Sequence, residues 1–322
     1  MNNIFVLVEH LKGNVNDLTY EMLGIGRKIA DSLGAKLNAV IIGNNINSLV
    51  TNFGIADAVF FVDNQKLEMP SPSTIADLLK SLIEAHGALF VLVGSTNVSS
   101  GVGPLLAQKL NLPFLNFCNN ITIDNNILTV TSQLFGGKIL SEVVLPENKG
   151  VISVYPGSFP AEAGKGDKKP EIEEFSISIK EDKTSFKNYI EPEAGDIDIT
   201  KESILISVGR GIENSDNISL AEELISILGG AICASRPVID QGWLPLSRQV
   251  GKSGMIVKPK LYFALGISGA PEHIEGMKDA GLIIAVNKDP GAPIFNYAHY
   301  GICADINDIV PTLIEELKKR KS

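Results

Sequence analysis

The sequence predicts an α/β fold in two domains, an N-terminal Rossmann-like domain and a C-terminal doubly wound domain on a parallel sheet. Apolar runs with the character of buried strands alternate with helical patterns in both halves, and this alternation implies right-handed crossovers and parallel pairing. The 322 residues suffice for two ordinary domains. An acidic stretch poor in apolar residues, 191–200, separates the halves. We therefore place the domains at 1–192 and 203–322, with a hinge at 193–202.

The first half begins with a regular alternation of strands and helices. We expect strands at 4–9, 36–43, 58–62 and 88–94, and helices at 18–33, 73–85 and 101–110. Residues 114–154 change to hairpin-like runs, 158–169 carry the turn formers of an exposed loop, and 175–179 indicate a further strand. Residues 94–97 with 101–103 could form a phosphate loop, but an ordinary capped strand-to-helix turn explains them better.

The second half restarts with a buried strand. We expect strands at 203–208, 231–235, 261–266, 282–287 and 301–304, one helix from Ser219 to the glycines at 229–230, and a closing helix at 306–319. Lysines lie at the C-terminal end of the closing helix, where the helix dipole favours cations. Five strand–helix units of this kind make a doubly wound domain.

Composition argues against several classes of protein. The formal net charge of −9 disfavours nucleic acid or an anionic membrane as a partner, because both need clustered cations. The apolar runs are too short to span a bilayer, and the chain enters its first strand without a signal or transit peptide, which favours the cytoplasm. Cys118, Cys233 and Cys303 are far apart, so we expect buried thiols rather than disulfides or metal ligands.

Polar residues follow the predicted strands of the second half, at the edge where open α/β sheets bind ligands. Gly209-Arg210-Gly211 ends the first strand, where glycine lets the backbone approach an anion and a guanidinium can fork onto phosphate oxygens. Ser235-Arg236-Pro237 ends the second. Taken alone, Gly209-Arg210-Gly211 is better explained as a surface turn, and Arg236 fits a surface salt bridge as well as a ligand contact. The loop Gln249-Val250-Gly251-Lys252-Ser253-Gly254 offers a hydroxyl to a heterocycle, or is a turn whose serine bonds its own backbone.

The strongest local signal is the segment 266–273, Gly-Ile-Ser-Gly-Ala-Pro-Glu-His. A strand followed by Ser-Gly-Ala and a proline at the first helical position leaves backbone N–H groups aimed at an anion. His273 then lies in the first helical turn and faces the same expected ligand site. Asn287 and Asp305 end two further strands, where an amide could recognise a heterocycle and a carboxylate a ribose hydroxyl. The four histidines show no metal-ligand spacing, and the order and spacing of the residues indicate no Ser–His–Asp triad.

In this order, the strand-end elements resemble the FAD-domain signature of the α subunit of electron-transfer flavoproteins. The matching segments are GRGI (209–212), ASRPV.D.GW.P...QVG.SG (234–254), VKP.LY.A.GISGA..H..GM (257–277), IIAVNKDP.APIF..A.YGI..D (283–305) and VP.L (310–313). They cover essentially all of residues 203–313, and the full series is far more specific than any piece. The first half fits the family's first domain in arrangement, with LVEH (7–10) as a thin match.

The resemblance implies one FAD on this chain. The residues it places around the FAD are Arg210, Ser235, Arg236, Gln249, Val250, Gly251, Lys252, Ser253, Ser268, Gly269, Ala270, Pro271, Glu272, His273, Asn287, Asp305 and Ile306. Family members hold the equivalent of Ser253 near flavin N5, that of Arg236 over the ring system and that of His273 near the N1/C2 carbonyl. Ser253 replaces the threonine of many members but keeps the hydroxyl. Pro271-Glu272 replaces the commoner Ile/Val-Gln, which affects the expected phosphate contacts.

The resemblance also implies a carrier of single electrons, and elementary electrostatics agrees. One-electron reduction places negative charge on the N1–C2–O locus of a flavin, so positive groups at Arg236 and His273 favour the anionic semiquinone. A unit charge about 4 Å away at an effective dielectric of about 20 is worth roughly 4 kcal/mol, or roughly 170 mV at about 59 mV per tenfold. We expect two separated one-electron steps and no covalent bond made or broken.

The expected partners follow from the same resemblance. Family members form a heterodimer with a β subunit, accept electrons from flavin dehydrogenases such as acyl-CoA dehydrogenases, and donate to a quinone oxidoreductase or ferredoxin. Simple carriers hold AMP on the β subunit, whereas bifurcating forms hold a second FAD and NADH there. Two alternatives belong to other classes: a nucleotide-binding regulatory module of universal-stress type using the first domain, and an NAD-binding enzyme using the second. Rotation of the FAD domain about the acidic segment 191–200 is expected from the family.

Overall fold

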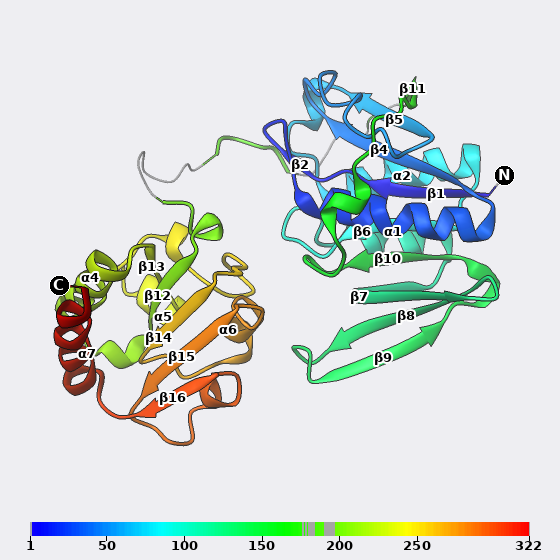
Figure 1. Ribbon diagram of the computed structural model, residues 1–322. Helices are drawn as coiled ribbons and strands as arrows, with labels where there is room; N and C mark the ends of the chain where they lie inside the picture. The colour runs from blue at the N-terminus through cyan, green and yellow to red at the C-terminus, as the bar shows by residue number, and fades with distance from the viewer. Residues whose placement is uncertain (1, 176, 178, 180–183, 190–196, 322) are drawn as a thin grey trace. The chain divides into compact units, whose positions relative to one another are not determined.

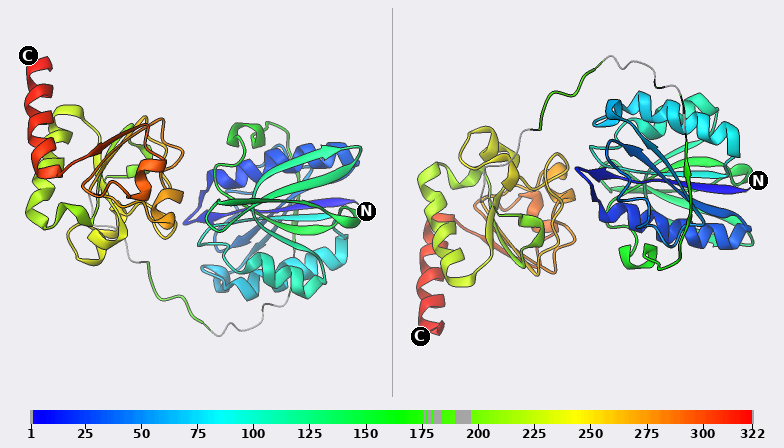
Figure 2. Two further views of the ribbon diagram at one scale, coloured as in Figure 1. Left: turned by 90° about the horizontal axis from the view of Figure 1, so that it is seen from below. Right: turned by 90° about the horizontal axis from the view of Figure 1, so that it is seen from above.

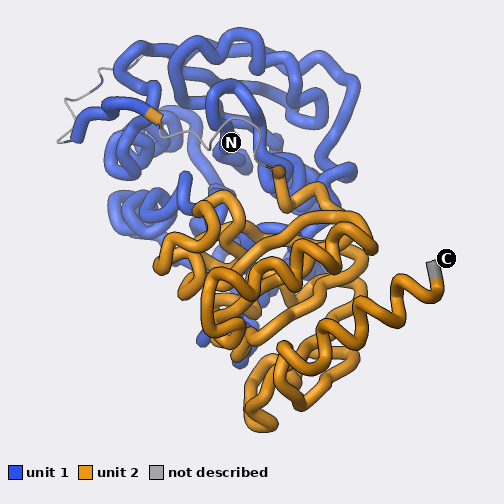
Figure 3. Tube along the Cα trace, turned by 90° about the vertical axis from the view of Figure 1, so that its left-hand side faces the viewer, with its two compact units in different colours: residues 1–188 blue, residues 189–322 orange. Residues whose placement is uncertain are grey.

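The computed structural model describes residues 2–175, 177, 179, 184–189 and 197–321. The chain divides into two compact units, residues 1–188 and 189–322, which Figure 3 shows in two colours. Residues 193–196 of the predicted hinge lie outside the described residues. Among the described residues, no helix is long and apolar enough to cross a membrane.

Unit 1 is built on a sheet that has nine strands among the described residues, in the order β11-β5-β4-β1-β6-β10-β7-β8-β9 (Figure 1). The strands are β1 (Asn3–Leu7), β4 (Lys36–Gly43), β5 (Ala58–Asp63), β6 (Phe90–Gly94), β7 (Phe114–Asp124), β8 (Ile127–Leu134), β9 (Ile139–Val144), β10 (Gly150–Val154) and β11 (Glu171–Glu174), with β2 (His10–Leu11) and β3 (Asn14–Val15) as a separate ribbon. Neighbours pair in parallel from β11 to β7, and β7–β8 and β8–β9 are antiparallel. The predicted hairpins therefore extend one edge of the predicted parallel sheet.

Helices cover both faces of this sheet (Figure 2). They are α1 (Asp17–Leu33), α2 (Pro72–His86) and α3 (Val102–Leu110). Alternate strand residues enter opposite cores because side chains of a strand point to opposite faces: Ile4 joins the core under α1, and Phe5 joins the core under α2 and α3. Helix α1 begins after Asn16, whose side chain accepts from the Leu18 N–H, and ends at Gly34 in the left-handed conformation.

Two predictions for unit 1 can be compared with the structure. The predicted loop 158–169 is mostly exposed, but it contains a 3₁₀ turn, Ala161–Gly164, that packs on α1 and buries Gly164. The predicted strand at 175–179 is wrong, since the strand lies at Glu171–Glu174. Ser176 and Ser178 of that prediction lie outside the described residues, while Phe175, Ile177 and Ile179 pack against the core under α2 and α3 without forming a strand.

The close packing of Gly164 on α1 leads to a stability prediction. A Cβ at this position would collide with the backbone of Tyr20, which cannot rotate away as a side chain could. We expect Gly164→Ala to destabilise unit 1 by about 2–4 kcal/mol, the upper range for overpacking. Urea unfolding followed by circular dichroism measures the loss. Gly150→Ala is the control, because its nearest atom would be 3.3 Å away, and an equal loss there would contradict this explanation.

Unit 2 contains a sheet of five parallel strands among the described residues, in the order β13-β12-β14-β15-β16. The strands are β12 (Ile204–Val208), β13 (Ala231–Ala234), β14 (Leu261–Leu265), β15 (Leu282–Asn287) and β16 (Tyr300–Cys303). This confirms the predicted parallel sheet. The strand order reverses between β12 and β14, and open α/β sheets bind ligands outside the strand ends at such a switch point.

The segments between these strands are mostly loops. The helices are α4 (Ile218–Leu228), α5 (Arg236–Asp240), α6 (Pro271–Glu275) and α7 (Ile306–Lys321), with 3₁₀ turns at Ile199–Lys201, Arg210–Ile212, Ser215–Asn217, Leu246–Arg248 and Pro293–Asn296. α4 and α7 pack on one face of the sheet, and α6 with its neighbouring loops covers the other. The prediction of five strand–helix units is therefore only partly right. The connections therefore place long loops at the carboxyl ends of the strands, where a site can form.

Candidate functional site

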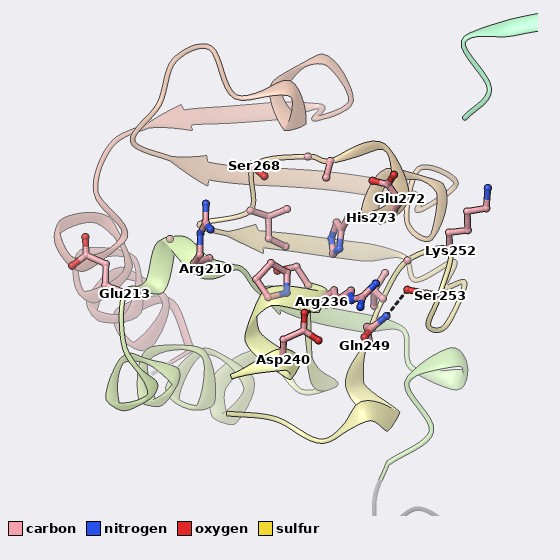
Figure 4. A pocket seen from close by; sticks show the side chains of 18 of the residues that line it. Arg210, Glu213, Arg236, Asp240, Gln249, Lys252, Ser253, Ser268, Glu272 and His273 are labelled. Atoms are coloured by element: carbon pink, nitrogen blue, oxygen red, sulfur yellow. Dashed lines mark hydrogen bonds and ion pairs between the residues drawn. The ribbon is translucent and has the colours of Figure 1, made fainter. Parts of the chain in front are cut away.

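A cavity of about 700 Å³ opens at the carboxyl ends of the strands of unit 2 (Figure 4). Its volume lies in the range of roughly 300–1,000 Å³ that is typical of cofactor sites. Thirteen of the predicted site residues line it, namely Arg210, Ser235, Arg236, Gln249, Val250, Gly251, Lys252, Ser253, Ser268, Gly269, Ala270, Glu272 and His273. The structure thus brings together side chains that the sequence scatters over several loops.

Four predicted site residues do not line the cavity: Pro271, Asn287, Asp305 and Ile306. The Asn287 amide instead donates to the Ile267 carbonyl at 2.8 Å and so fixes the turn after β14. The Asp305 carboxylate accepts from the Asn307 N–H at 2.9 Å at the start of α7. The Ile306 side chain is buried in the core beside α7. Contact of these four residues with FAD remains a prediction.

Six lining residues were not among the predicted site residues: Gly211, Glu213, Pro237, Asp240, Ile267 and Lys288. All but Glu213 lie inside segments of the quoted signature, so strand-end logic applied to whole segments could have found them. Glu213 carries no such signal, because it follows a short turn whose course the sequence does not show.

Glycine lets the strand ends at the switch point touch backbone to backbone. Gly209 donates its N–H to the Leu265 carbonyl at 2.8 Å, and Gly211 donates to the Gly266 carbonyl at 3.0 Å. A Cβ at Gly211 would lie 2.7 Å from that same oxygen, and Gly266 itself has φ of 65°. The loop that carries Arg210 is therefore fixed directly on the end of β14, as close approach to a cofactor requires.

The loop 249–254 orients the Ser253 hydroxyl. The Gln249 amide donates to Ser253 Oγ at 2.9 Å, which Figure 4 marks with a dashed line. The loop is anchored at both sides, because the Val250 N–H donates to Ala234 O at 2.9 Å and the Lys252 N–H to Glu272 O at 2.7 Å. Ser253 thus bonds a neighbouring side chain rather than its own backbone, and keeps its proton for a group in the cavity.

His273 belongs to a buried polar chain beneath the cavity. Its Nε2 lies 2.9 Å from the Tyr262 hydroxyl, which donates to Ser207 Oγ at 2.7 Å. Burial lowers the pKa of His273 to about 4, and the nearby backbone of Val250 acts in the opposite direction. The imidazole is therefore neutral near pH 7, and the expected positive charge on His273 is not met. Its buried Nδ1 has no hydrogen-bond partner among the described residues.

The lowered pKa of His273 predicts a dependence of stability on pH. The folded chain resists protonation of this ring until about pH 4, whereas the unfolded chain takes the proton near 6.5. Stability is therefore full above pH 6.5 and falls as the pH drops from 6.5 to 4, by about 3 kcal/mol at 1.36 kcal/mol per pKa unit. Urea unfolding across this range measures it. His273→Gln should flatten the profile, and a profile that stays equally steep would assign the loss to other groups.

The charged side chains around the cavity are mostly paired. The cations are Arg210, Arg236, Lys252 and Lys288, and the acids are Glu213, Asp240 and Glu272. Arg236 Nε lies 3.4 Å from Asp240 Oδ2, and Lys288 Nζ lies 2.8 Å from Glu213 Oε1. The Arg210 guanidinium has no ion-pair or hydrogen-bond partner among the described residues and points into the space below Ser268 in Figure 4.

These features fit a phosphate-bearing cofactor with a polar ring. An unpaired guanidinium beside glycine backbone suits a phosphate, and the Ser253 hydroxyl with the unpartnered His273 Nδ1 suits ring heteroatoms. The residues present therefore fit an FAD. Cys233 lies buried under the site, where burial raises the pKa of its thiol to about 12. Cys118 is also a buried free thiol, but Cys303 is exposed, so the expectation of three buried thiols is wrong for one of them.

Unit 1 fills its own switch point with an acidic side chain. Glu9, buried after β1, accepts from Thr96 Oγ1 at 2.7 Å, and a Cβ at Gly94 would collide with its carboxylate. The Ser99 N–H donates to Thr96 Oγ1 at 3.2 Å. Segment 94–103 is therefore bonded within the unit as an ordinary strand-to-helix turn. A carboxylate at this point repels a phosphate, which weakens the alternative of a regulatory nucleotide module.

Comparisons with known proteins agree along the whole chain. Residues 4–180 match the family model "Electron transfer flavoprotein domain", and residues 198–278 match "Electron transfer flavoprotein FAD-binding domain". The chain is 34% identical to the electron transfer flavoprotein subunit alpha of Thermoanaerobacterium thermosaccharolyticum, over 99% of this chain and 98% of that one. It is 33% identical to the acryloyl-CoA reductase electron transfer subunit beta of Anaerotignum propionicum, over 99% and 96%. It is 31% identical to subunit LctC of the lactate dehydrogenase (NAD(+),ferredoxin) of Acetobacterium woodii, over 97% and 76%.

Proposed function

The chain belongs to the electron transfer flavoproteins as an alpha subunit, and we propose that it holds one FAD in the cavity of unit 2 and passes electrons singly. The observation that carries this proposal is the cavity at the switch point, which thirteen of the predicted FAD residues line together. The FAD supplies the redox chemistry, and this chain makes or breaks no bond of its own.

The side chains of the cavity have distinct proposed tasks. Arg210 and the glycine backbone at the ends of β12 and β14 bind the phosphates. The Ser253 hydroxyl, oriented by Gln249, donates a hydrogen bond to the ring edge at N5. Arg236 places positive charge over the ring, and the neutral His273 contributes a hydrogen bond rather than a charge. Together, these fixed groups would separate the two one-electron potentials of a bound FAD.

An alpha subunit implies a beta subunit, and we propose a heterodimer whose second chain holds AMP or a second FAD. The names of two relatives support the bifurcating form. One relative is an electron transfer subunit of acryloyl-CoA reductase, and the other is a subunit of a lactate dehydrogenase that uses NAD(+) and ferredoxin. Bifurcation is therefore the second candidate, with a flavin dehydrogenase as electron partner and ferredoxin or a quinone oxidoreductase as acceptor.

One experiment tests the family function and separates its two forms. The chain is purified with its co-expressed beta subunit, and flavin and AMP are counted after denaturation. One FAD with one AMP supports the simple carrier, and two FADs support bifurcation. A colourless complex that takes up no added FAD overturns the proposal.

A further inference from the structure

Glu213 and Lys288 form an ion pair at the mouth of the cavity. Glu213 follows the turn after β12, and Lys288 follows β15 directly. Strand β14 lies between these two strands, so the pair, 2.8 Å from Lys288 Nζ to Glu213 Oε1, spans the carboxyl end of β14. Both side chains line the cavity, and both remain about half exposed. The pair therefore stands at the switch point, where a phosphate group would enter.

The backbone at Glu213 is strained. Its φ is 74° and its ψ is −44°, and the Asn214 N–H donates across it to the Ile212 carbonyl at 2.9 Å. This is the rare positive-φ form of the γ-turn, which residues with a Cβ avoid. Strain of this kind gathers at ligand sites, where the surrounding structure maintains it. This strained turn carries the acid that pairs with Lys288, and Lys288 forms no other ion pair among the described residues.

The Glu213 carboxylate on this turn affects the charge that Lys288 offers to a ligand. Glu213 raises the pKa of Lys288, with a smaller contribution from Asp305, so Lys288 carries a full positive charge. The Glu213 carboxylate neutralises that charge within the cavity. The neighbouring Arg210 has no such partner among the described residues. A diphosphate carries two negative charges. Among the described residues, the strand ends offer it one cation without a counter-ion, Arg210, and two that are already paired, Arg236 and Lys288.

We propose that Lys288 is a phosphate-binding residue of the cavity and that Glu213 is its competing counter-ion. The proposal rests on the proposed FAD site and adds two residues, Lys288 and Glu213, that were not among the predicted FAD residues. The diphosphate and the Glu213 carboxylate compete for the same ammonium group. Glu213 therefore weakens the affinity for a diphosphate-bearing cofactor, and Lys288 strengthens it.

The test is FAD affinity in the full complex with the beta subunit, after removal of flavin and titration by fluorescence quenching. Lys288→Gln should weaken binding about tenfold, as expected for loss of a charge-assisted hydrogen bond, and Lys288→Arg should restore most of it. Glu213→Gln should tighten binding severalfold. The double variant should match Lys288→Gln, because Glu213 acts only through Lys288. Riboflavin, which has no phosphate, should bind all variants equally.

A matched control lies on the same unit, away from the cavity. Glu223 pairs with Lys318 between α4 and α7, and Glu223→Gln makes the same chemical change without altering the cavity. Unchanged or weaker FAD binding by Glu213→Gln overturns the inference, and so does a double variant that keeps the gain. Failure of the wild-type complex to bind FAD overturns the proposed function itself. If the wild-type complex binds FAD and only the variants deviate from the expected affinities, the inference about Lys288 and Glu213 fails and the proposed function stands.

Discussion

Replacing Arg236 by alanine in the FAD-loaded complex should lower the midpoint potential of the first electron by roughly 50 to 100 mV. An unscreened unit charge about 4 Å from the reduced ring is worth roughly 170 mV at an effective dielectric of about 20. Two features of the structure reduce that value. Asp240 Oδ2 lies 3.4 Å from Arg236 Nε, and the Arg236 side chain is 68% exposed in the chain without FAD.

Asp240 supplies a control of opposite sign for this prediction. Asp240→Asn removes the counter-charge while keeping the shape, so it should raise the first-electron potential as Arg236→Ala lowers it. Arg236→Lys keeps the charge but loses the planar guanidinium, and should fall between wild type and alanine. A spectroelectrochemical titration gives all three potentials. If neither Arg236→Ala nor Asp240→Asn moves the potential, Arg236 has no part in tuning the flavin.

The site was predictable from sequence because its parts are local. Each segment follows a strand, and parallel strands end at the same edge of a sheet, so residues far apart in the sequence are brought together by topology alone. Pairings between loops were not predictable on this basis. Lys288 and Glu213 are 75 positions apart, and nothing local shows that their side chains meet. The charge of His273 was not foreseeable either way, because the burial of this ring beside Tyr262, which lowers its pKa, depends on packing.

The fold was predictable where an apolar pattern marks both the element and its burial. The strand β4 was predicted with its observed bounds, Lys36–Gly43, because its apolar run 39–43 is buried on both faces. β11 was missed because its residues Glu171–Glu174 are exposed and its pairing with β5 uses the backbone. The alternation of Phe175, Ile177 and Ile179 gave the wrong strand, since these side chains pack on the core without strand pairing.

Replacing Gly209 by alanine should lower FAD affinity by at least about 100-fold, the larger of the binding effects expected here. A Cβ at this position would collide with the Gly266 carbonyl oxygen and lie 2.7 Å from the Gly266 carbonyl carbon. Both are backbone atoms inside the contact between β12 and β14, so the added methyl separates the two strand ends. We expect unit 2 to lose about 2–4 kcal/mol of stability as well, as overpacked sites do. FAD titration and urea unfolding of the same variant measure the two effects.

Comparing the loss of FAD affinity with the loss of stability shows whether the backbone contact at Gly209 shapes the site or only supports the fold. Gly291→Ala is the control, because its nearest atom would be the Asp289 carboxylate at 3.3 Å, a side chain that can move. Gly209→Ala could lose FAD simply because part of unit 2 unfolds. In that case FAD binding should return at low temperature, where the variant folds again, and the loss would be due to stability alone. A loss that persists in the folded variant means that the Gly209–Gly266 contact sets the position of Arg210. Wild-type affinity in a folded Gly209→Ala complex would show that the phosphates do not bind at this junction.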